Sequence, residues 1–366
     1  MASVEKRVRN DKVSWLARWR EPDGAQRKRS FRRRVDAENF LVGVQADLLR
    51  GTYVDPADRT TVAEYARLWV SGRPHRPATA ERQRSLVETH LAPTRLGRMA
   101  LQRVRPSDVQ AWVTDRSRVM APSTLRLAVS LLRSVCAGAV LDRRITSSPV
   151  VRITLPARDA ERVVPLTVEQ VRELSAAMPP RNRAMVLAQA GLGLRVGELL
   201  ALRVDDVDFL RRTVRVECQI ARLTQDRQPT KTPRSRRVVP LPQVVADALA
   251  QHLAEFGNGA DGSLFATTHG NHYRSDYYDS LFRERVTLTS LPAGTSSHDL
   301  RHHYASVLLA AGESVVAVAE RLGHENAGLV LSTYGHLMPD SEDRTRRAVD
   351  DAWRAPSVPP GEGQAV

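Results

Sequence analysis

The 366-residue sequence is poor in several residue types, and each shortage excludes a class of protein. Its two cysteines, Cys136 and Cys218, lie far apart and form no CxxC pattern, so a disulfide framework is not expected. No continuous apolar run reaches the roughly 18 residues of a membrane span, and the charged N-terminus lacks a signal-peptide core. We therefore expect a protein of the reducing cytoplasm that does not enter a membrane.

Lysine is scarce as well. Arginine supplies nearly all basic side chains, and Lys6, Lys12, Lys28 and Lys231 are the only lysines. Arginine stays charged in proteins, whereas lysine can give up a proton. Lys231 stands alone in the last nine-tenths of the chain, which makes it a candidate for a place where the proton itself matters. Chance survival of one lysine codon explains it almost as well.

The excess positive charge is confined to the front of the chain. The formal net charge is +14, of which residues 1–50 contribute +6, residues 51–160 contribute +9 and residues 161–366 contribute −1. A basic N-terminal part joined to a neutral C-terminal part indicates a region that binds a polyanion, followed by a region with a second activity. Arginine-rich codon usage is the alternative explanation. The length and the 42% apolar content allow two or three domains with packed cores.

The first 54 residues predict a small domain of three strands and a helix. "KVSWLARWREPDG" alternates apolar and polar residues and ends in a turn, and "AQRKRSFRRR" follows as a basic strand. The next segment predicts a helix with Asp36 as its N-cap and Gly51 as its stop. A basic ribbon of this kind can enter the major groove of DNA, although a solvated charged edge is the alternative. The candidate DNA contacts are Arg18, Arg20, Lys28 and Arg32.

The rest of the chain predicts two larger domains and a tail. Residues 58–150 carry helical periodicity throughout, and the proline-bounded segment 151–165 predicts a linker. Residues 166–353 predict a mixed, mostly helical α+β domain. It opens with Thr167 and Gln170 in capping-box spacing, and "RTVRVECQIA" and "SRRVVPL" form strands joined near Lys231. Residues 354–366 predict a disordered tail.

The segment "SHDLRHHYAS" raises a choice between a metal and a phosphate. His298 and His302 lie four apart and would share a helix face, as in zinc sites. No glutamate follows in HExxH fashion and no third ligand is evident. His298 and Arg301 also share a face, as groups that grip a phosphate do. We therefore expect a phosphate site, with His302 and its neighbour His303 as packing or supporting residues.

Five short motifs stand in a fixed order in the back half: "GLRVGELLAL", "TKTPRSRRVVPL", "HDLRHHYAS", "RLGH" and "STYGHL". Their order and residue types resemble the tyrosine recombinase (phage integrase) family over residues 166–350. The resemblance implies a multidomain protein: an arm-binding domain at 1–54, a helical core-binding domain at 58–150, and a mixed catalytic domain at 166–353. His303 departs from the pattern, because a threonine or serine usually follows the R-H pair.

The chemistry of covalent DNA cleavage fits the residue types in these motifs. A tyrosine hydroxyl can form a phosphoester but has a pKa near 10 and needs help to ionise. Forked guanidinium groups can hold the phosphate while its oxygens gain charge. The resemblance implies a catalytic set of Arg195, Lys231 as the general acid, His298, Arg301, His324 and Tyr334 as the nucleophile, with Glu198 orienting the cations. Tyr277, Tyr278 and Tyr304 rival Tyr334 by residue type only.

The resemblance also implies partners and excludes cofactors. Core and arm sites on double-stranded DNA are the expected substrate, bound by four protomers, with a DNA-bending protein and an excision or directionality factor as further partners. No metal is expected, because cations on the protein neutralise the phosphate, and no ATP is expected, because the phosphotyrosyl bond conserves the energy of the cleaved diester. Arg234, Arg236 and Arg237 could add backbone contacts to the DNA. The alternatives are a chromosome- or plasmid-dimer resolvase, a type IB topoisomerase and a catalytically silent DNA-binding regulator.

Overall fold

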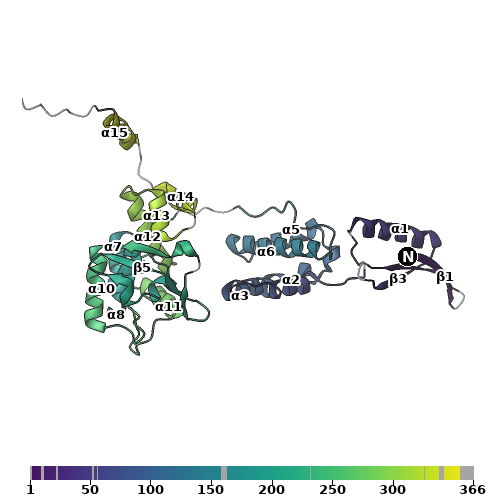
Figure 1. Cartoon of the computed structure of the whole chain (residues 1–366), viewed down its shortest axis with the longest axis horizontal. Helices are drawn as coiled ribbons and strands as arrows, with labels where there is room; N and C mark the ends of the chain where they lie inside the picture. Colours follow the sequence, from purple (N-terminus) through teal and green to yellow (C-terminus); the bar gives the residue numbers. More distant parts are fainter. Residues whose placement is uncertain are drawn as a thin grey trace, which may run out of the picture. The chain divides into compact units, whose positions relative to one another are not determined.

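The computed structural model divides the chain into two compact units, residues 1–159 and 160–366, which are described separately (Figure 1). The structure describes residues 2–9, 12–21, 24–51, 53–55, 57–157, 163–230, 232–324, 326–337 and 342–354. The predicted tail beyond residue 354, the middle of the predicted linker, and Lys231 lie outside the described residues.

The first unit begins with the predicted three-stranded sheet and its helix. Strands β1 (Ser3–Arg9), β2 (Lys12–Arg20) and β3 (Gln26–Phe31) pair antiparallel in that order, and helix α1 (Arg34–Arg50) follows. Trp19 and Ala17 on β2 pack on α1, and the Trp19 indole N–H donates to the hydroxyl of Tyr53 at 2.8 Å. Several aromatic side chains, among them Trp19 against Phe40 of α1, and a few apolar side chains therefore hold this sheet to its helix.

The ends of α1 show which part of the helix prediction was correct. Gly51 caps the C-terminus in the left-handed conformation at φ 69°, as predicted. Asp36 as N-cap was wrong, because the helix begins at Arg34 and its N-cap, Arg33, makes no side-chain cap. Asp36 instead lies in the first turn, where its carboxylate faces the positive end of the helix dipole.

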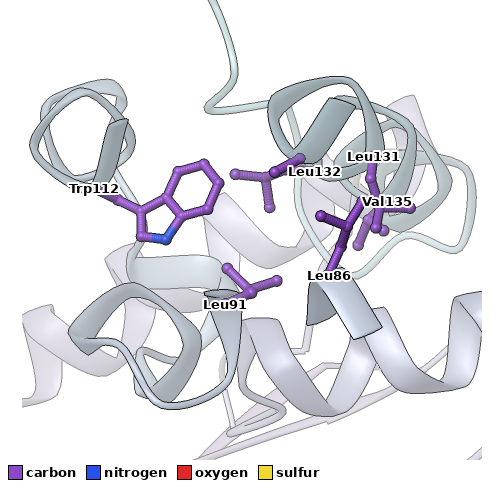
Figure 2. A pocket seen from close by; sticks show the side chains of 7 residues that line it. Leu86, Leu91, Trp112, Leu131, Leu132 and Val135 are labelled. Atoms are coloured by element: carbon purple, nitrogen blue, oxygen red, sulfur yellow. The ribbon is translucent and has the colours of Figure 1, made fainter. Parts of the chain in front are cut away.

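Helices make up the remainder of the first unit, as the periodicity predicts. They are α2 (Val62–Ser71), α3 (Pro77–Ser85), a π-helical turn (Leu86–Leu91), α4 (Arg95–Arg98), a 3-10 turn (Leu101–Arg103), α5 (Pro106–Arg116) and α6 (Pro122–Leu141). Figure 2 shows the apolar cavity at their centre, where Trp112 of α5 and Leu132 of α6 face Leu91 of the π-helical turn. This core is separate from the one beneath the N-terminal sheet.

Helix α6 is a partial exception to the expectation about apolar runs. Two arginines interrupt its apolar residues, but over the described residues it is the one helix long and apolar enough to cross a membrane. Half of the relevant window is buried, and α6 contacts α2, α5 and the π-helical turn. Its apolarity is thus accounted for by its central place in the helical core.

The second unit is mixed and mostly helical. Its helices are α7 (Val168–Ala177), α8 (Pro180–Leu192), α9 (Val196–Leu200), α10 (Gln243–Phe256), α11 (Ser275–Val286), α12 (Ser297–Ala310), α13 (Val315–Leu322), α14 (Ala327–Tyr334) and α15 (Glu342–Trp353). Its strands are β4 (Val207–Asp208), β5 (Thr213–Val216), β6 (Cys218–Ile220), β7 (Arg227–Pro229) and β8 (Arg237–Pro240). The predicted capping box of Thr167 and Gln170 is present at the start of α7.

The strands pair differently from the simple hairpin that the sequence predicted. The stretch predicted as one strand breaks at Glu217, so that β5 pairs with β8 and with β4, whereas β6 pairs with β7. The β6–β7 hairpin leans on α9, and a Cβ atom added at Gly197 would meet the carbonyl oxygen of Ile220 at 2.9 Å. The segment that leads to Lys231 therefore starts beside the helix that carries Glu198.

Candidate active site

A buried carboxylate lies at the centre of the candidate site. Glu198, on the first turn of α9, is 2% exposed and accepts from the guanidinium of Arg195 at 2.7 Å and from that of Arg237 at 2.9 Å. Arg301 approaches it at 3.9 Å. Burial would raise the pKa of Glu198, but Arg237 and Arg195 hold it at about 2. Glu198 is therefore ionised at pH 7 and fixes the positions of three guanidinium groups.

Arg301 is held by the ends of two helices. Its side chain is 1% exposed and donates to the carbonyl oxygens of Gly193, at 2.7 Å, and Leu322, at 2.5 Å. Gly193 caps α8 and Leu322 ends α13, where carbonyl groups lack helical partners and carry the negative end of the dipole. Burial, together with repulsion from Arg195, lowers the pKa of Arg301 to about 9.

Two features of position 193 require glycine. Its φ of 63° is left-handed, and a Cβ atom there would lie 2.3 Å from the ring of Tyr304. Tyr304 packs in the core on the same helix as Arg301, and Tyr278 is fully buried with its hydroxyl donating to Gln189 at 3.2 Å. These two rival tyrosines are core residues. Tyr277 is exposed and stacks on Tyr273.

Arg237 was misassigned from the sequence. Its side chain is 4% exposed, and besides Glu198 it binds the carbonyl oxygens of Arg321 and Ser235 at 2.6 and 3.1 Å. It cannot also lie on the surface as a DNA contact, so that interpretation was wrong. Strand alternation could have identified it, because Arg237 shares the inward face of β8 with the fully buried Val239. Arg236, the neighbouring candidate, is exposed.

The nucleophile candidate contacts His302, which the sequence predicted to be a packing or supporting residue. Tyr334, the last residue of α14, is 2% exposed, and its hydroxyl lies 2.5 Å from Nδ1 of His302. The ring of His298 stands edge-on to that of His302 at 4.7 Å, one turn earlier on α12. Burial raises the pKa of Tyr334, and the charge of Arg301 opposes this. His302 therefore lies between His298 and the tyrosine hydroxyl.

His324 completes the cluster. His324 follows the left-handed cap of α13, and among the described residues its buried Nδ1 has no hydrogen-bond partner. Burial and the charges of Arg301 and Arg195 lower the pKa of His324 to about 4. Burial, then His302 and Arg301, lower the pKa of His298 to about 4, although more than a third of its surface is exposed. His303 is buried and binds the carbonyl oxygen of Leu166.

The site carries more positive than negative charge. Three guanidinium groups surround one carboxylate, and both His298 and His324 are neutral at pH 7. Arg195 is the most open of these cations, with 38% of its side chain exposed. An anion with several oxygen atoms, such as a phosphodiester, suits this arrangement. Among the described residues, no three His, Cys, Asp or Glu side chains gather as a metal site would require.

The candidate DNA contacts of the first unit share one face of its sheet. Arg18 and Arg20 alternate on β2 with the buried Ala17 and Trp19, so they point away from α1. Lys28 lies directly opposite Arg18 in the register of β2 and β3. Arg18 also pairs with Glu5 at 2.8 Å while remaining about half exposed. A further candidate, Arg32, is exposed just beyond β3.

Comparison with known proteins agrees with this architecture. Residues 165–340 match the phage integrase family. The chain is similar to a putative prophage phiRv2 integrase of Mycobacterium tuberculosis, with 28% identity over 87% of each chain. Its fold resembles the Tn1549 transposon integrase in complex with a circular intermediate DNA, with a TM-score of 0.70, 22% identity, and coverage of 80% of this chain and 99% of that one.

A second solved structure has the same fold. It is a lambda integrase tetramer bound to a Holliday junction, with a TM-score of 0.61, 17% identity, and coverage of 88% of this chain and 96% of that one. The family match spans every described residue of the candidate site. Residues 165–340 form a domain of the phage integrase (tyrosine recombinase) family, and the similarity of the chain to integrases supports DNA recombination as its function.

Proposed function

We propose that the chain is a site-specific integrase that cleaves and rejoins DNA through a 3′-phosphotyrosyl intermediate, and that it integrates and excises a mobile element. The observation that carries the proposal is the contact of Tyr334 with His302 beside the buried, fixed Arg301, whose charge also acts on Tyr334, His298 and His324. The names of the relatives, a prophage integrase and a transposon integrase, support a mobile element as the substrate.

In the proposed mechanism the scissile phosphate replaces solvent beside Arg195, the more exposed cation, and also comes within the field of the buried Arg301. Both cations are preorganised by Glu198, so little reorganisation is needed as negative charge builds on the phosphate oxygens. The neutral imidazoles of His298 and His324 donate hydrogen bonds to those oxygens. The unpartnered Nδ1 of His324 gains its partner only when the substrate is bound.

The bond changes are two transesterifications. The Tyr334 oxygen attacks phosphorus, the bond from phosphorus to the 5′-oxygen breaks, and Lys231 gives that oxygen its proton. A 5′-hydroxyl from a second duplex then reverses the step. Because a phosphodiester is conserved throughout, the reaction needs no ATP. Because Arg195 and Arg301 supply the positive charge that stabilises the phosphate oxygens, it needs no metal ion.

The assembly we propose follows from the number of strands to be cut. Two duplexes cleaved on both strands require four tyrosines, hence four protomers on DNA; the lambda integrase relative is a tetramer on a Holliday junction. The β1–β3 face with Arg18, Arg20 and Lys28 would bind an arm site, with Arg32 beside it and Arg236 near the core site. A DNA-bending protein and a directionality factor would assist in the bacterial cytoplasm.

The test is covalent capture on DNA. Nicked duplexes tiled from the DNA that flanks this gene are incubated with wild type and Tyr334→Phe in EDTA, and denaturing gels are scored for protein attached to DNA. We expect an adduct with wild type only, unaffected by the chelator. Specific binding without an adduct would favour a silent regulator. Relaxation of plasmids without site preference would favour a type IB topoisomerase, and reaction only at chromosome- or plasmid-dimer sites would favour a resolvase.

A further inference from the structure

We propose that His302 is the base that accepts the proton of the Tyr334 hydroxyl, and that the ring of His298 packs against the ring of His302 and holds it in position. The inference rests on the proposed function, because it requires Tyr334 to be the nucleophile. It deepens that function by assigning proton acceptance to a residue that the sequence predicted to pack or to support the site.

The geometry is direct. Nδ1 of His302 lies 2.5 Å from the Tyr334 oxygen, and the two rings meet at an interplanar angle of 61° with centroids 5.4 Å apart. The tyrosine side chain is 2% exposed, so bulk water has little access to it. A base must lie within hydrogen-bond reach of the proton that it takes, and His302 does.

The order of the two histidines follows from the helix. His298 and His302 are four apart on α12, so they stack along one face, and the His298 ring meets that of His302 edge-on with an interplanar angle of 80°. His298 is the more exposed of the two, and His302 is half-buried. The outer histidine is thus open to a phosphate, and the inner one faces the tyrosine.

Burial, more than the charges nearby, keeps His302 neutral. Burial lowers its pKa below 6.5, Arg301 lowers it further, and Asp299 on the same helix raises it. The other titratable groups in contact with it are His298 on α12 and Tyr334 on α14. At pH 7 the imidazole therefore carries one proton, and with that proton on Nε2 its Nδ1 can accept from the tyrosine.

The step balances without an added reagent. The proton moves from the Tyr334 oxygen to Nδ1 of His302 as the bond from that oxygen to phosphorus forms. The 5′-oxygen leaves with the electron pair of its bond to phosphorus. It receives its proton not from His302 but from Lys231, as in the proposed function. When the strand is rejoined, His302 returns its proton to the tyrosine.

The test measures single-turnover adduct formation on the nicked duplex that wild type cleaves. His302→Asn keeps an acceptor near the place of Nδ1 but cannot take up a proton, and we expect its rate to fall about 10²-fold. His303→Asn is the matched control, because it makes the same change one residue further along α12, in a side chain that binds Leu166. We expect its rate to stay within about threefold of wild type. DNA affinity and melting temperature of each variant report folding.

A second substrate separates the two protons. When sulfur replaces the bridging 5′-oxygen, the leaving group needs no proton, so a defect in the general acid is relieved whereas a defect in the base persists. We expect His302→Asn to stay about 10²-fold slow on this substrate and Lys231→Ala to recover. The wild-type rate should fall as the pH drops through the pKa of His302, and His302→Gln serves as a second variant if Asn impairs folding.

The outcomes are distinguishable. An adduct at Tyr334 in wild type, with His302→Asn and His302→Gln as fast and with the same pH profile, overturns the assignment of His302 and leaves the proposed function standing. Recovery of His302→Asn on the sulfur substrate also overturns it, because His302 would then serve the leaving group. Absence of any wild-type adduct on every tile, or an adduct that survives Tyr334→Phe, overturns both proposals.

Discussion

Glu198→Gln should unfold the second unit far more easily than its small chemical change suggests. The substitution keeps the shape of the side chain but removes the only carboxylate within 4.0 Å of Arg195, Arg237 and Arg301 among the described residues. Breaking a buried ion pair by removing one partner costs about 3–5 kcal/mol. The drop in the pKa of Glu198 from 4.5 to about 2 corresponds independently to about 3 kcal/mol of stability.

The pH dependence of this loss has a definite sign. The folded pKa of Glu198 lies below its unfolded value, so its contribution is present above about pH 4.5 and is lost as the pH falls toward 2. The difference between wild type and Glu198→Gln should therefore shrink from about 3 kcal/mol at pH 7 to about 1 kcal/mol at pH 3. Glu173→Gln is the control, because this exposed carboxylate binds Ser290 at the surface and should cost under about 1 kcal/mol.

The assay must report on the second unit alone. Tryptophan fluorescence is unsuitable, because only Trp353 of the five tryptophans lies beyond residue 159. Hydrogen exchange of α12 amides as a function of urea gives the unfolding free energy of this unit, and α6 amides serve as an internal reference. The account is contradicted if the unfolding free energy of Glu198→Gln lies within about 1 kcal/mol of the wild-type value at pH 7. It is also contradicted if the difference between the two free energies grows on acidification.

Three further predictions concern the core, the histidines and one strained arginine. Leu132→Ala should cost the first unit about 2–5 kcal/mol by leaving a cavity beside Trp112, measured by urea titration of tryptophan fluorescence, whereas Leu127→Ala on the exposed face of α6 should cost under about 1 kcal/mol; equal effects would contradict the assigned core. Because the folded pKa values of His298 and His324 lie near 4, the melting temperature of the second unit should fall from pH 6.5 toward 4, and His324→Gln should flatten that fall in calorimetry. Arg143→Gly should raise stability by up to about 1 kcal/mol because φ there is 54°, whereas Arg133→Gly inside α6 should lower it by about 1 kcal/mol; a loss in both would refute the strain.

The family motifs predicted a set of site residues whose side chains lie together in the structure, while their roles stay a prediction. The family motifs pointed to Arg195, Glu198, His298, Arg301, His324 and Tyr334, and the structure brings these side chains into one cluster. Each is a local signal, either a short motif or a pair three or four residues apart on a helix. The capping box at Thr167 and the glycine stop at Gly51 were predictable for the same reason.

The features that the sequence did not predict all depend on contacts between residues distant in sequence. Helical spacing places His298 and His302 on one face but cannot tell which of them meets Tyr334, because that depends on how α14 packs on α12. Arg237 looked like one more surface arginine until Glu198, 39 residues away, was seen to bind it. The break at Glu217 likewise follows from two strands finding different partners, β8 and β7.

The most direct test of the central claim is to identify the linked residue. Wild-type protein is trapped on the nicked duplex, the adduct is digested with protease and nuclease, and the peptide is sequenced by mass spectrometry. We predict a peptide with Tyr334 linked to a nucleotide through its 3′-phosphate. A nucleotide on Tyr277 or another side chain, or a link to a 5′-phosphate, would contradict the account.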